Sequence, residues 1–377
     1  MLVLLAGSPL LVFIPVAQAQ KSPGASWTFA LYVNGDNNLD TYWYRYSLPW
    51  LEQVPASSQV NIVALVSLQS STRSLVEQIK GGSVIIVGNY SKMDMGIPAT
   101  LQWWISDSAT LFPSTYYALT VWDHGSGWQY VSVDDVFGHS LSMTQLQVAI
   151  DGGSRAIDIL GFDACMMANA EVAYEVAQTG KASYLVASEE LVPFQGFPYN
   201  KMLTTLVNNP QMLPKDFATS MVGSWGQYYA TMTFASNVNL AAIDLVQMKN
   251  TIGTFTAWST EMLSLLPSYQ SAYATALKSA YTVTNTHYFV DASNLATKLL
   301  ASKGISDPNL ITATKNMQSA IQTYVLSVWN SQKMTMCKGI TLYWGTGTDW
   351  SRNSANYALT AFSTVTGWGN FLAQYNA

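Results

Sequence analysis

Apolar residues in the first half of the chain gather in short runs that have the length of β-strands and are rich in β-branched and aromatic side chains. These runs predict strands at residues 27–33, 60–68, 83–87, 116–122, 157–162 and 184–187. Stretches between them predict helices at residues 37–53, 98–111 and 168–178. Strands that alternate with helices form βαβ units, and nearly continuous apolar strands suit a sheet that is covered on both faces. The pattern therefore predicts an α/β fold with a mostly parallel central sheet.

Beyond residue 235 the pattern changes, because long helix-like segments dominate. Helices are predicted at residues 245–265, 269–281, 295–302 and 308–331, and one late strand at residues 339–343. We expect residues 236–377 to form a helix-rich C-terminal domain that contributes this late strand. No Pro- or Ser-rich linker separates it from residues 20–235, so its boundary is soft.

The N-terminal segment differs from the rest of the chain. Residues 1–20 carry no charge, residues 10–16 form an apolar block, and Ala17-Gln18-Ala19 has the small-x-small pattern of a cleavage site. No Lys or Arg precedes the apolar block, so an uncleaved membrane anchor is the alternative. We predict a cleaved signal peptide over residues 1–19, and hence a secreted, extracellular protein.

Charged residues are scarce. The chain has 17 Lys+Arg and 22 Asp+Glu among 377 residues, or 10%, against a typical ~25%. An aromatic content of 12% excludes a disordered chain, and two Cys exclude a disulfide scaffold. A net charge of -5 argues against a nucleic-acid partner. The long uncharged stretch 217–243 is too rich in Ser, Thr, Asn and Gln to be a bilayer span, so we expect no transmembrane span in the mature chain.

The same scarcity leads to a hypothesis about stability. Acid destabilises proteins largely by protonating paired carboxylates, and a surface rich in Ser, Thr and Tyr depends little on such pairs. We therefore expect a protein adapted to an acidic or otherwise harsh medium.

Two predicted strands run into residues with nucleophilic chemistry. Strand 116–122 leads into His124, and strand 157–162 leads into Cys165. In a parallel sheet, ligands bind beyond the carboxyl ends of the strands. A thiolate is a strong nucleophile, and an imidazole can take the thiol proton. The N–H of Gly125, in a flexible Gly-Ser-Gly segment, is suited to an oxyanion hole.

Each residue also has a simpler interpretation. A lone Cys after an apolar strand is usually a small buried hydrophobe. Cys337 is interpreted as structural, and a Cys165–Cys337 disulfide would abolish the nucleophile. A different α/β hydrolase is disfavoured because the chain has no G-x-S-x-G motif.

Several motifs, in order along the chain, resemble those of the clostripain family of cysteine peptidases. W-D-H-G-S-G-W at residues 122–128 and F-D-A-C-M-M-A at residues 162–168 resemble the His and Cys motifs of the family. D-N-N-L at residues 36–39 resembles an early family motif, and S-E-E at residues 188–190 begins a segment similar to the family's S-E-E…P…G-W-P-Y. Residues 171–177 resemble the family's helix after the nucleophile, and the late segments 339–343 and 368–372 resemble its C-terminal patterns. The resemblance covers most of residues 27–200.

The resemblance implies a caspase-like αβα sandwich over residues 20–235, of the kind that caspases and gingipains share. It implies that His124 and Cys165 form a catalytic dyad and that the amides of Gly125 and Cys165 form the oxyanion hole. Family members typically cleave after Arg or Lys, and the resemblance places the responsible carboxylate at Asp163. A carboxylate at the base of a pocket pairs well with a guanidinium or ammonium group. A turn or helix-cap role is the alternative for Asp163.

Neighbouring carboxylates are weaker candidates. Asp123 adjoins His124 and is a candidate to orient it, or equally a loop cap. Glu189 and Glu190 follow the next strand and are candidates to line the same cleft, although such pairs are more often solvated. Two residues depart from the family pattern: Phe194 replaces a frequent Gly, which we expect to narrow or reshape the pocket wall, and Phe197 replaces the usual Trp.

These observations favour an exported cysteine endopeptidase that forms a thioester acyl-enzyme, acts on protein or peptide substrates and is a monomer. Calcium dependence occurs in parts of the family, but the chain has no D-x-[DN]-x-[DN]-G loop. Asp36 and the Asp134-Asp135 pair offer oxygens, yet no metal or other cofactor is assigned. The rival hypothesis is a catalytically silent, caspase-like surface or binding protein.

Overall fold

The protein is described here by a computed structural model that covers residues 24–284, 286 and 288–377. The predicted signal peptide, residues 1–19, lies outside the described residues.

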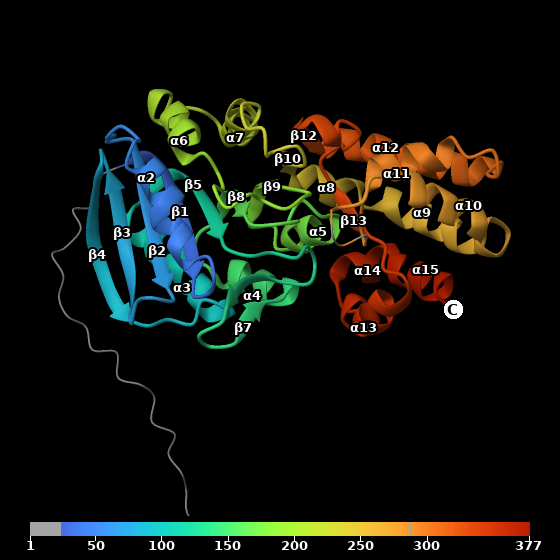
Figure 1. Cartoon of the computed structure of the whole chain (residues 1–377), viewed down its shortest axis with the longest axis horizontal. Coiled ribbons are helices and arrows are strands. Elements are labelled where there is room, and N and C mark those ends of the chain that lie inside the picture. Colours follow the sequence, from blue (N-terminus) through green and yellow to red (C-terminus); the bar gives the residue numbers. More distant parts are fainter. Residues whose placement is uncertain (1–23, 285, 287) are drawn as a thin grey trace, which may run out of the picture.

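A nine-stranded sheet runs through the described part of the chain, in the order β12-β10-β9-β8-β5-β1-β2-β3-β4 (Figure 1). Its strands are β1 (Ala25–Gly35), β2 (Val60–Leu68), β3 (Arg73–Lys80), β4 (Ser83–Ser91), β5 (Ser114–Trp122), β8 (Ile157–Asp163), β9 (Ala182–Ala187), β10 (Asn239–Asp244) and β12 (Val325–Asn330). The central strands β9, β8, β5, β1 and β2 are all parallel, whereas the strands on both flanks pair antiparallel. This confirms the predicted α/β fold with parallel strands at the centre of the sheet.

Helices cover both faces of this sheet. Successive residues of each central strand point to opposite faces, and since both sets are apolar, both faces need to be covered. One face packs against α3 (Pro98–Leu111), α4 (Met143–Gly152) and α5 (Ala170–Gln178). The other packs against α2 (Leu48–Leu51), α6 (Tyr199–Asn208) and α7 (Pro214–Tyr229). In β1, Tyr32 belongs to the first core and Phe29 to the second. The result is the αβα sandwich that the sequence predicted.

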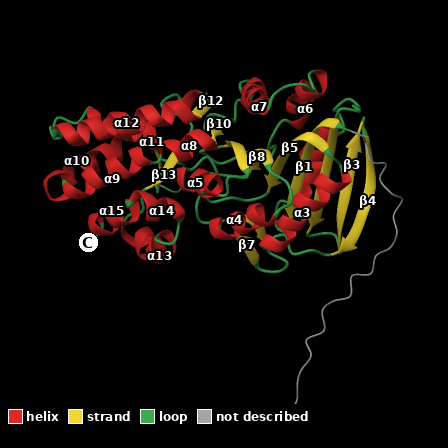
Figure 2. Ribbon diagram, turned by 180° about the vertical axis from the view of Figure 1, so that it is seen from behind, coloured by secondary structure: helices red, strands yellow, loops and turns green. Residues whose placement is uncertain are grey.

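The C-terminal third is mainly helical, as expected. Five helices lie at the end of the molecule away from β3 and β4 (Figure 1 and, from behind, Figure 2): α8 (Leu245–Thr251), α9 (Gly253–Ser264), α10 (Leu266–Ser279), α11 (Ala292–Leu300) and α12 (Pro308–Tyr324). Three more follow at the end of the chain: α13 (Gly347–Tyr357), α14 (Ala361–Thr366) and α15 (Trp368–Tyr375). Among the described residues, no helix is both long and apolar enough to cross a bilayer.

The sheet continues past the predicted boundary at residue 235, since β9 on one side of it pairs with β10 on the other. The late strand, β13 (Thr341–Tyr343), does not join the central sheet but pairs with β11 (Phe289–Asp291). Residues 325–331, predicted as the end of a helix, instead contain the edge strand β12. The pairing of β12 with β10 competes with helix continuation there, and only the tertiary fold supplies that partner.

Smaller elements surround the strand ends. A helical segment begins at α1 (Asp40–Tyr42) and continues through a π-helical turn (Trp43–Ser47) into α2. A hairpin of β6 (Val131–Asp134) and β7 (His139–Leu141) follows the loop that carries His124. The strand β3, which the sequence pattern missed, pairs with β2 and β4.

Candidate active site

Register in the sheet brings His124 and Cys165 to the same edge. Strands β5 and β8 are adjacent and parallel, and Trp122 pairs with Asp163 at their carboxyl ends. His124 and Cys165 each lie two residues beyond this paired position. Because adjacent strands are about 4.8 Å apart, both side chains leave the sheet side by side, and both line one cavity of about 610 Å³.

The two loops that follow these strands are packed against each other at Gly125. A Cβ atom at this position would lie 2.8 Å from the carbonyl oxygen of Cys165 and 2.8 Å from Sδ of Met167. A side chain therefore has no room here, which explains why the residue after His124 is glycine. The close approach brings the backbone of Gly125 next to that of Cys165.

The imidazole of His124 is held by Asn38, a residue of the D-N-N-L motif. Nε2 of His124 lies 2.7 Å from Oδ1 of Asn38, so the ring donates its Nε2 proton and keeps Nδ1 as an acceptor. Burial lowers the pKa of His124, and the charge of Asp135 opposes this shift. The sequence pattern matched D-N-N-L only as a family motif and did not predict Asn38 as a site residue. The signal available was the position of the motif directly after β1, at the carboxyl end of a parallel strand.

The neighbouring residue Asn37 holds the side chain of Asp123. Its Nδ2 donates to Oδ1 of Asp123 at 2.7 Å and to the carbonyl of Val133 at 2.7 Å. Asp123 also lines the cavity, and burial raises the pKa of its carboxyl well above its usual value. The side-chain partner of the His124 ring is thus Asn38, and Asp123 has the role of a buried loop brace.

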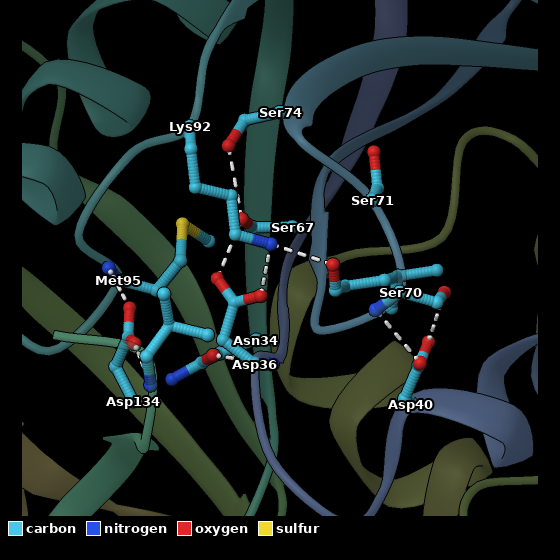
Figure 3. Close-up of polar contacts among 12 residues, drawn as sticks. Asn34, Asp36, Asp40, Ser67, Ser70, Ser71, Ser74, Lys92, Met95 and Asp134 are labelled. Atoms are coloured by element: carbon cyan, nitrogen blue, oxygen red, sulfur yellow. Dashed lines mark hydrogen bonds and ion pairs between the residues drawn. The ribbon is translucent and has the colours of Figure 1, made fainter. Parts of the chain in front are cut away.

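A buried ion pair anchors the D-N-N-L segment that carries Asn37 and Asn38. Asp36 pairs with Lys92, and the hydroxyl of Ser67 donates to Oδ2 of Asp36 at 2.6 Å (Figure 3). Asp134 accepts three backbone N–H groups, including that of Met95 at 2.8 Å. The oxygens of Asp36 and Asp134 that the sequence offered for calcium are therefore engaged within the chain.

The thiol of Cys165 is half-buried and makes no disulfide, since both cysteines are free. The N–H of Val192 donates to Sγ at 3.3 Å. Burial raises the pKa of Cys165 to about 11, and the nearby carboxylates of Asp163, Glu190 and Asp123 add to the shift. The thiol is therefore protonated at neutral pH in this structure.

Asp163 lies in the same cavity and is held by the segment that follows Pro193. Its Oδ2 accepts the N–H of Phe197 at 3.0 Å and the hydroxyl of Tyr199 at 2.8 Å. Gly196 has φ +67°, and a Cβ there would lie 2.6 Å from Oδ2 of Asp163. Burial raises the pKa of Asp163 to about 7, although both hydrogen bonds oppose the shift. The Gly and Tyr of the G-x-P-Y pattern thus have a physical role in seating this carboxylate.

Aromatic and aliphatic side chains form the cavity wall. The ring of Phe194 stacks on that of Tyr42, with centroids 4.3 Å apart and an angle of 5° between planes. Both rings line the cavity together with Leu39, Leu191, Val192, Phe234 and Val238. Phe194, where the family often has Gly, thus forms part of the cavity wall. Phe197 is buried in the core, where its ring contacts that of Trp225 edge-on.

The expectation that Glu189 and Glu190 line the cleft or are solvated is wrong. Neither residue is among those that line the cavity, and both are buried. Glu190 accepts hydrogen bonds from the Tyr281 hydroxyl and from Thr284. Its carbonyl accepts the N–H of Met166 at 3.0 Å, so this segment braces the loop of Cys165. Partners of these carboxylates include Tyr281, 91 residues after Glu190, and Gly339, 150 residues after Glu189, and no local pattern reveals such contacts.

Comparison with known proteins agrees with this description. The chain resembles a secreted C11 cysteine protease from Bacteroides thetaiotaomicron, "iotapain", with a TM-score of 0.72 and 17% identity over 91% of this chain and 99% of that one. It is also similar to an inactive zymogen C11 protease from Parabacteroides distasonis, with a TM-score of 0.71 and 15% identity over 93% and 99% of the two chains. At such identities the likeness concerns the fold. Among curated proteins, none matches the sequence.

The fold, together with the match to a family model, defines this protein as a cysteine-type peptidase. The clostripain family model matches residues 31–375, nearly the whole described chain. The chain therefore belongs to the clostripain family.

Proposed function

We propose that the protein is an exported cysteine endopeptidase in which Cys165 is the nucleophile and His124 the general base. The observation that carries the proposal is the convergence of His124, Cys165 and Asp163 on one cavity at the carboxyl edge of the parallel strands.

The geometry supports a mechanism that starts from a neutral pair. Burial keeps the thiol of Cys165 protonated and the imidazole of His124 unprotonated. On substrate binding, Nδ1 of His124 takes the thiol proton while its Nε2–H stays on Asn38. The thiolate attacks the scissile carbonyl, and the protonated imidazole then gives its proton to the leaving amine. A thioester acyl-enzyme remains, and a water molecule that His124 activates hydrolyses it.

Two backbone amides are suited to the developing oxyanion. Among the hydrogen bonds of the described residues, the N–H groups of Gly125 and Cys165 have no acceptor. The tight packing of the Gly125 loop on the Cys165 loop keeps these groups close together. Fixed donors of this kind stabilise a transition-state charge more than they stabilise the substrate.

We propose that the cavity is the pocket for the residue before the scissile bond and that it prefers Arg or Lys. The stacked rings of Tyr42 and Phe194 suit the alkyl stem of a long cationic side chain, and the carboxylate of Asp163 suits its charged head. With a pKa near 7, Asp163 binds a cation better as the pH rises through neutrality.

A scan of fluorogenic peptides that differ only at this position tests the proposal. We expect cleavage after Arg and Lys, loss of all cleavage in Cys165→Ala, and loss of the basic preference in Asp163→Asn. An apolar preference that persists in Asp163→Asn would refute the role of Asp163 and leave the dyad intact. A folded wild-type protein that neither cleaves nor reacts with an Arg-directed chloromethyl ketone would favour the silent binding protein.

Export, cofactor use and oligomeric state belong to the same proposal. We propose that residues 1–19 are removed on secretion, that the mature protein is a monomer acting on proteins or peptides, and that the hydrolysis needs no cofactor. N-terminal sequencing of the secreted protein, its mass in solution, and its activity with and without added calcium test these points separately.

A further inference from the structure

Three buried side chains outside the active site converge from distant parts of the chain. They are Glu189, just beyond the end of β9; Asp291, the N-cap of α11; and Cys337, in the loop before β13. A carboxylate oxygen of each acid and Sγ of Cys337 all lie within 4.8 Å of one another. None of the three residues is exposed to solvent. The proposed peptidase mechanism uses none of them.

The cluster holds two carboxyls and a thiol at close range without an ion-pair partner among the described residues. No ion pair among the described residues involves Glu189 or Asp291. Lys338 is adjacent in sequence, but its side chain is exposed. Two carboxylates in a buried site repel each other strongly unless a proton or a cation lies between them.

Hydrogen-bond donors around the cluster favour the ionised carboxylates. Asp291 accepts the backbone N–H of Asn294 on Oδ1 and that of Lys338 on Oδ2. Glu189 accepts Nδ2 of Asn239 and the N–H of Gly339, both on Oε2. N–H groups that point at carboxylate oxygens stabilise the charged form, but at Glu189 burial and the charge of Asp291 outweigh them and raise the pKa of its carboxyl. In this structure the two carboxyls hydrogen-bond to each other through a proton on Glu189. A bound cation would take the place of that proton between the two oxygens.

One ligand atom remains available. Oε1 of Glu189 is fully buried and accepts no N–H donor from the described residues, although the Glu189 carboxyl hydrogen-bonds to that of Asp291. The hydroxyl of Tyr324, also buried, has no partner among the described residues either. Buried polar atoms without partners are rare and mark a place for an additional ligand.

We propose that Glu189, Asp291 and Cys337 form a buried structural zinc site. Zinc accepts a mixed set of sulfur and oxygen ligands at about 2.0–2.3 Å, whereas calcium and magnesium avoid sulfur. Tetrahedral ligands are then roughly 3.3–3.8 Å apart, so the cluster contracts by about 1 Å when it binds the ion. The thiol of Cys337 and the carboxyl of Glu189 each release a proton to solvent, so that a thiolate and two carboxylates bind the ion.

The site joins the C-terminal region to the active-site edge. Glu189 belongs to the segment 188–190, whose carbonyls accept the N–H groups of Met166 and Ala168 in the Cys165 loop. Asp291 and Cys337 belong to the C-terminal region. The zinc ion therefore fixes the segment that braces the nucleophile loop, whichever substrate the enzyme cleaves.

The test measures metal binding rather than activity. The full chain, loaded with zinc and dialysed, is expected to retain about one zinc ion per chain by mass spectrometry of the metal. Replacing zinc with Co²⁺ is expected to give a thiolate-to-cobalt charge-transfer band. Removing zinc with a chelator is expected to lower the melting temperature.

Matched variants of the two free thiols identify the site. Cys337→Ser is expected to lose the cobalt band and to weaken zinc binding at least 10-fold, whereas Cys165→Ser retains both. Glu189→Gln, a substitution that adds no volume, is expected to weaken zinc binding as well. Circular dichroism checks that each variant is folded. A folded wild-type protein that retains no zinc and shows no cobalt band would overturn the proposal. A band that disappears in Cys165→Ser but persists in Cys337→Ser would do the same.

Discussion

The carboxyl of Asp163 is expected to make the protein more stable in acid than at neutral pH. It is buried, and its pKa rises from 3.8 to about 7. The folded protein therefore holds the proton more tightly than the unfolded chain does. The stability from this proton is complete below the unfolded pKa and is lost as the pH rises through about 7.

The size of the effect follows from the shift. A rise of about three pKa units, at 1.36 kcal/mol each, corresponds to about 4 kcal/mol lost from the free energy of unfolding between pH 4 and pH 8. Burial likewise raises the pKa values of Glu77 and Glu171 to about 7, so these residues add to the same trend.

The substitution Asp163→Asn isolates the contribution of Asp163 to the pH dependence of the free energy of unfolding. Asparagine has the same shape, and its carbonyl oxygen can still accept the N–H of Phe197 and the hydroxyl of Tyr199. Urea unfolding from pH 4 to pH 8 is expected to show a steeper loss of stability for the wild type than for the variant. Parallel profiles would contradict the raised pKa of Asp163, and a wild type that gains stability as the pH rises would contradict the whole argument.

Three further substitutions test the site. Asn38→Ala is expected to lower kcat/KM roughly 10- to 100-fold, which is part of the total effect of a general base, and to shift the pH–rate profile. The circular dichroism spectrum is expected to stay the same. An unchanged pH–rate profile would mean that Asn38 does not position His124. Gly196→Ala is expected to cost about 2 kcal/mol of stability by urea unfolding, because φ is +67° and the new Cβ meets Asp163, and an equally stable variant would refute this. Phe194→Gly is expected to raise KM for Lys substrates roughly 5- to 10-fold with kcat unchanged, through loss of the ring that stacks on Tyr42; equal KM values would show that this wall does not contact substrate.

The acid hypothesis drawn from composition thus acquires a mechanism that the composition did not contain. The sequence showed only that charged residues are few. The structure shows that several carboxyls are buried with raised pKa values, including Asp163 and Glu171. Burial, rather than the scarcity of charges alone, predicts stability in acid.

The sequence by itself determined the central strands, the helices α3 and α5 and the helical segment after β1, and the positions of His124 and Cys165, but it did not predict α4. Strand 60–68 and helix 98–111 have the bounds that the pattern predicted, because buried apolar runs and helical periodicity are local signals. The two candidate residues were found in the same way, since each follows a strand directly.

Only the tertiary structure decided the features that depend on distant partners. The strands β3 and β12 lie at the flanks of the sheet, where pairing with a neighbour outweighs a weak local preference. Asn38 and His124 are 86 residues apart, and Tyr281 lies 91 residues from Glu190. A hydrogen bond or a buried charge is set by what the folded chain brings alongside it, and no local pattern in the sequence contains that information.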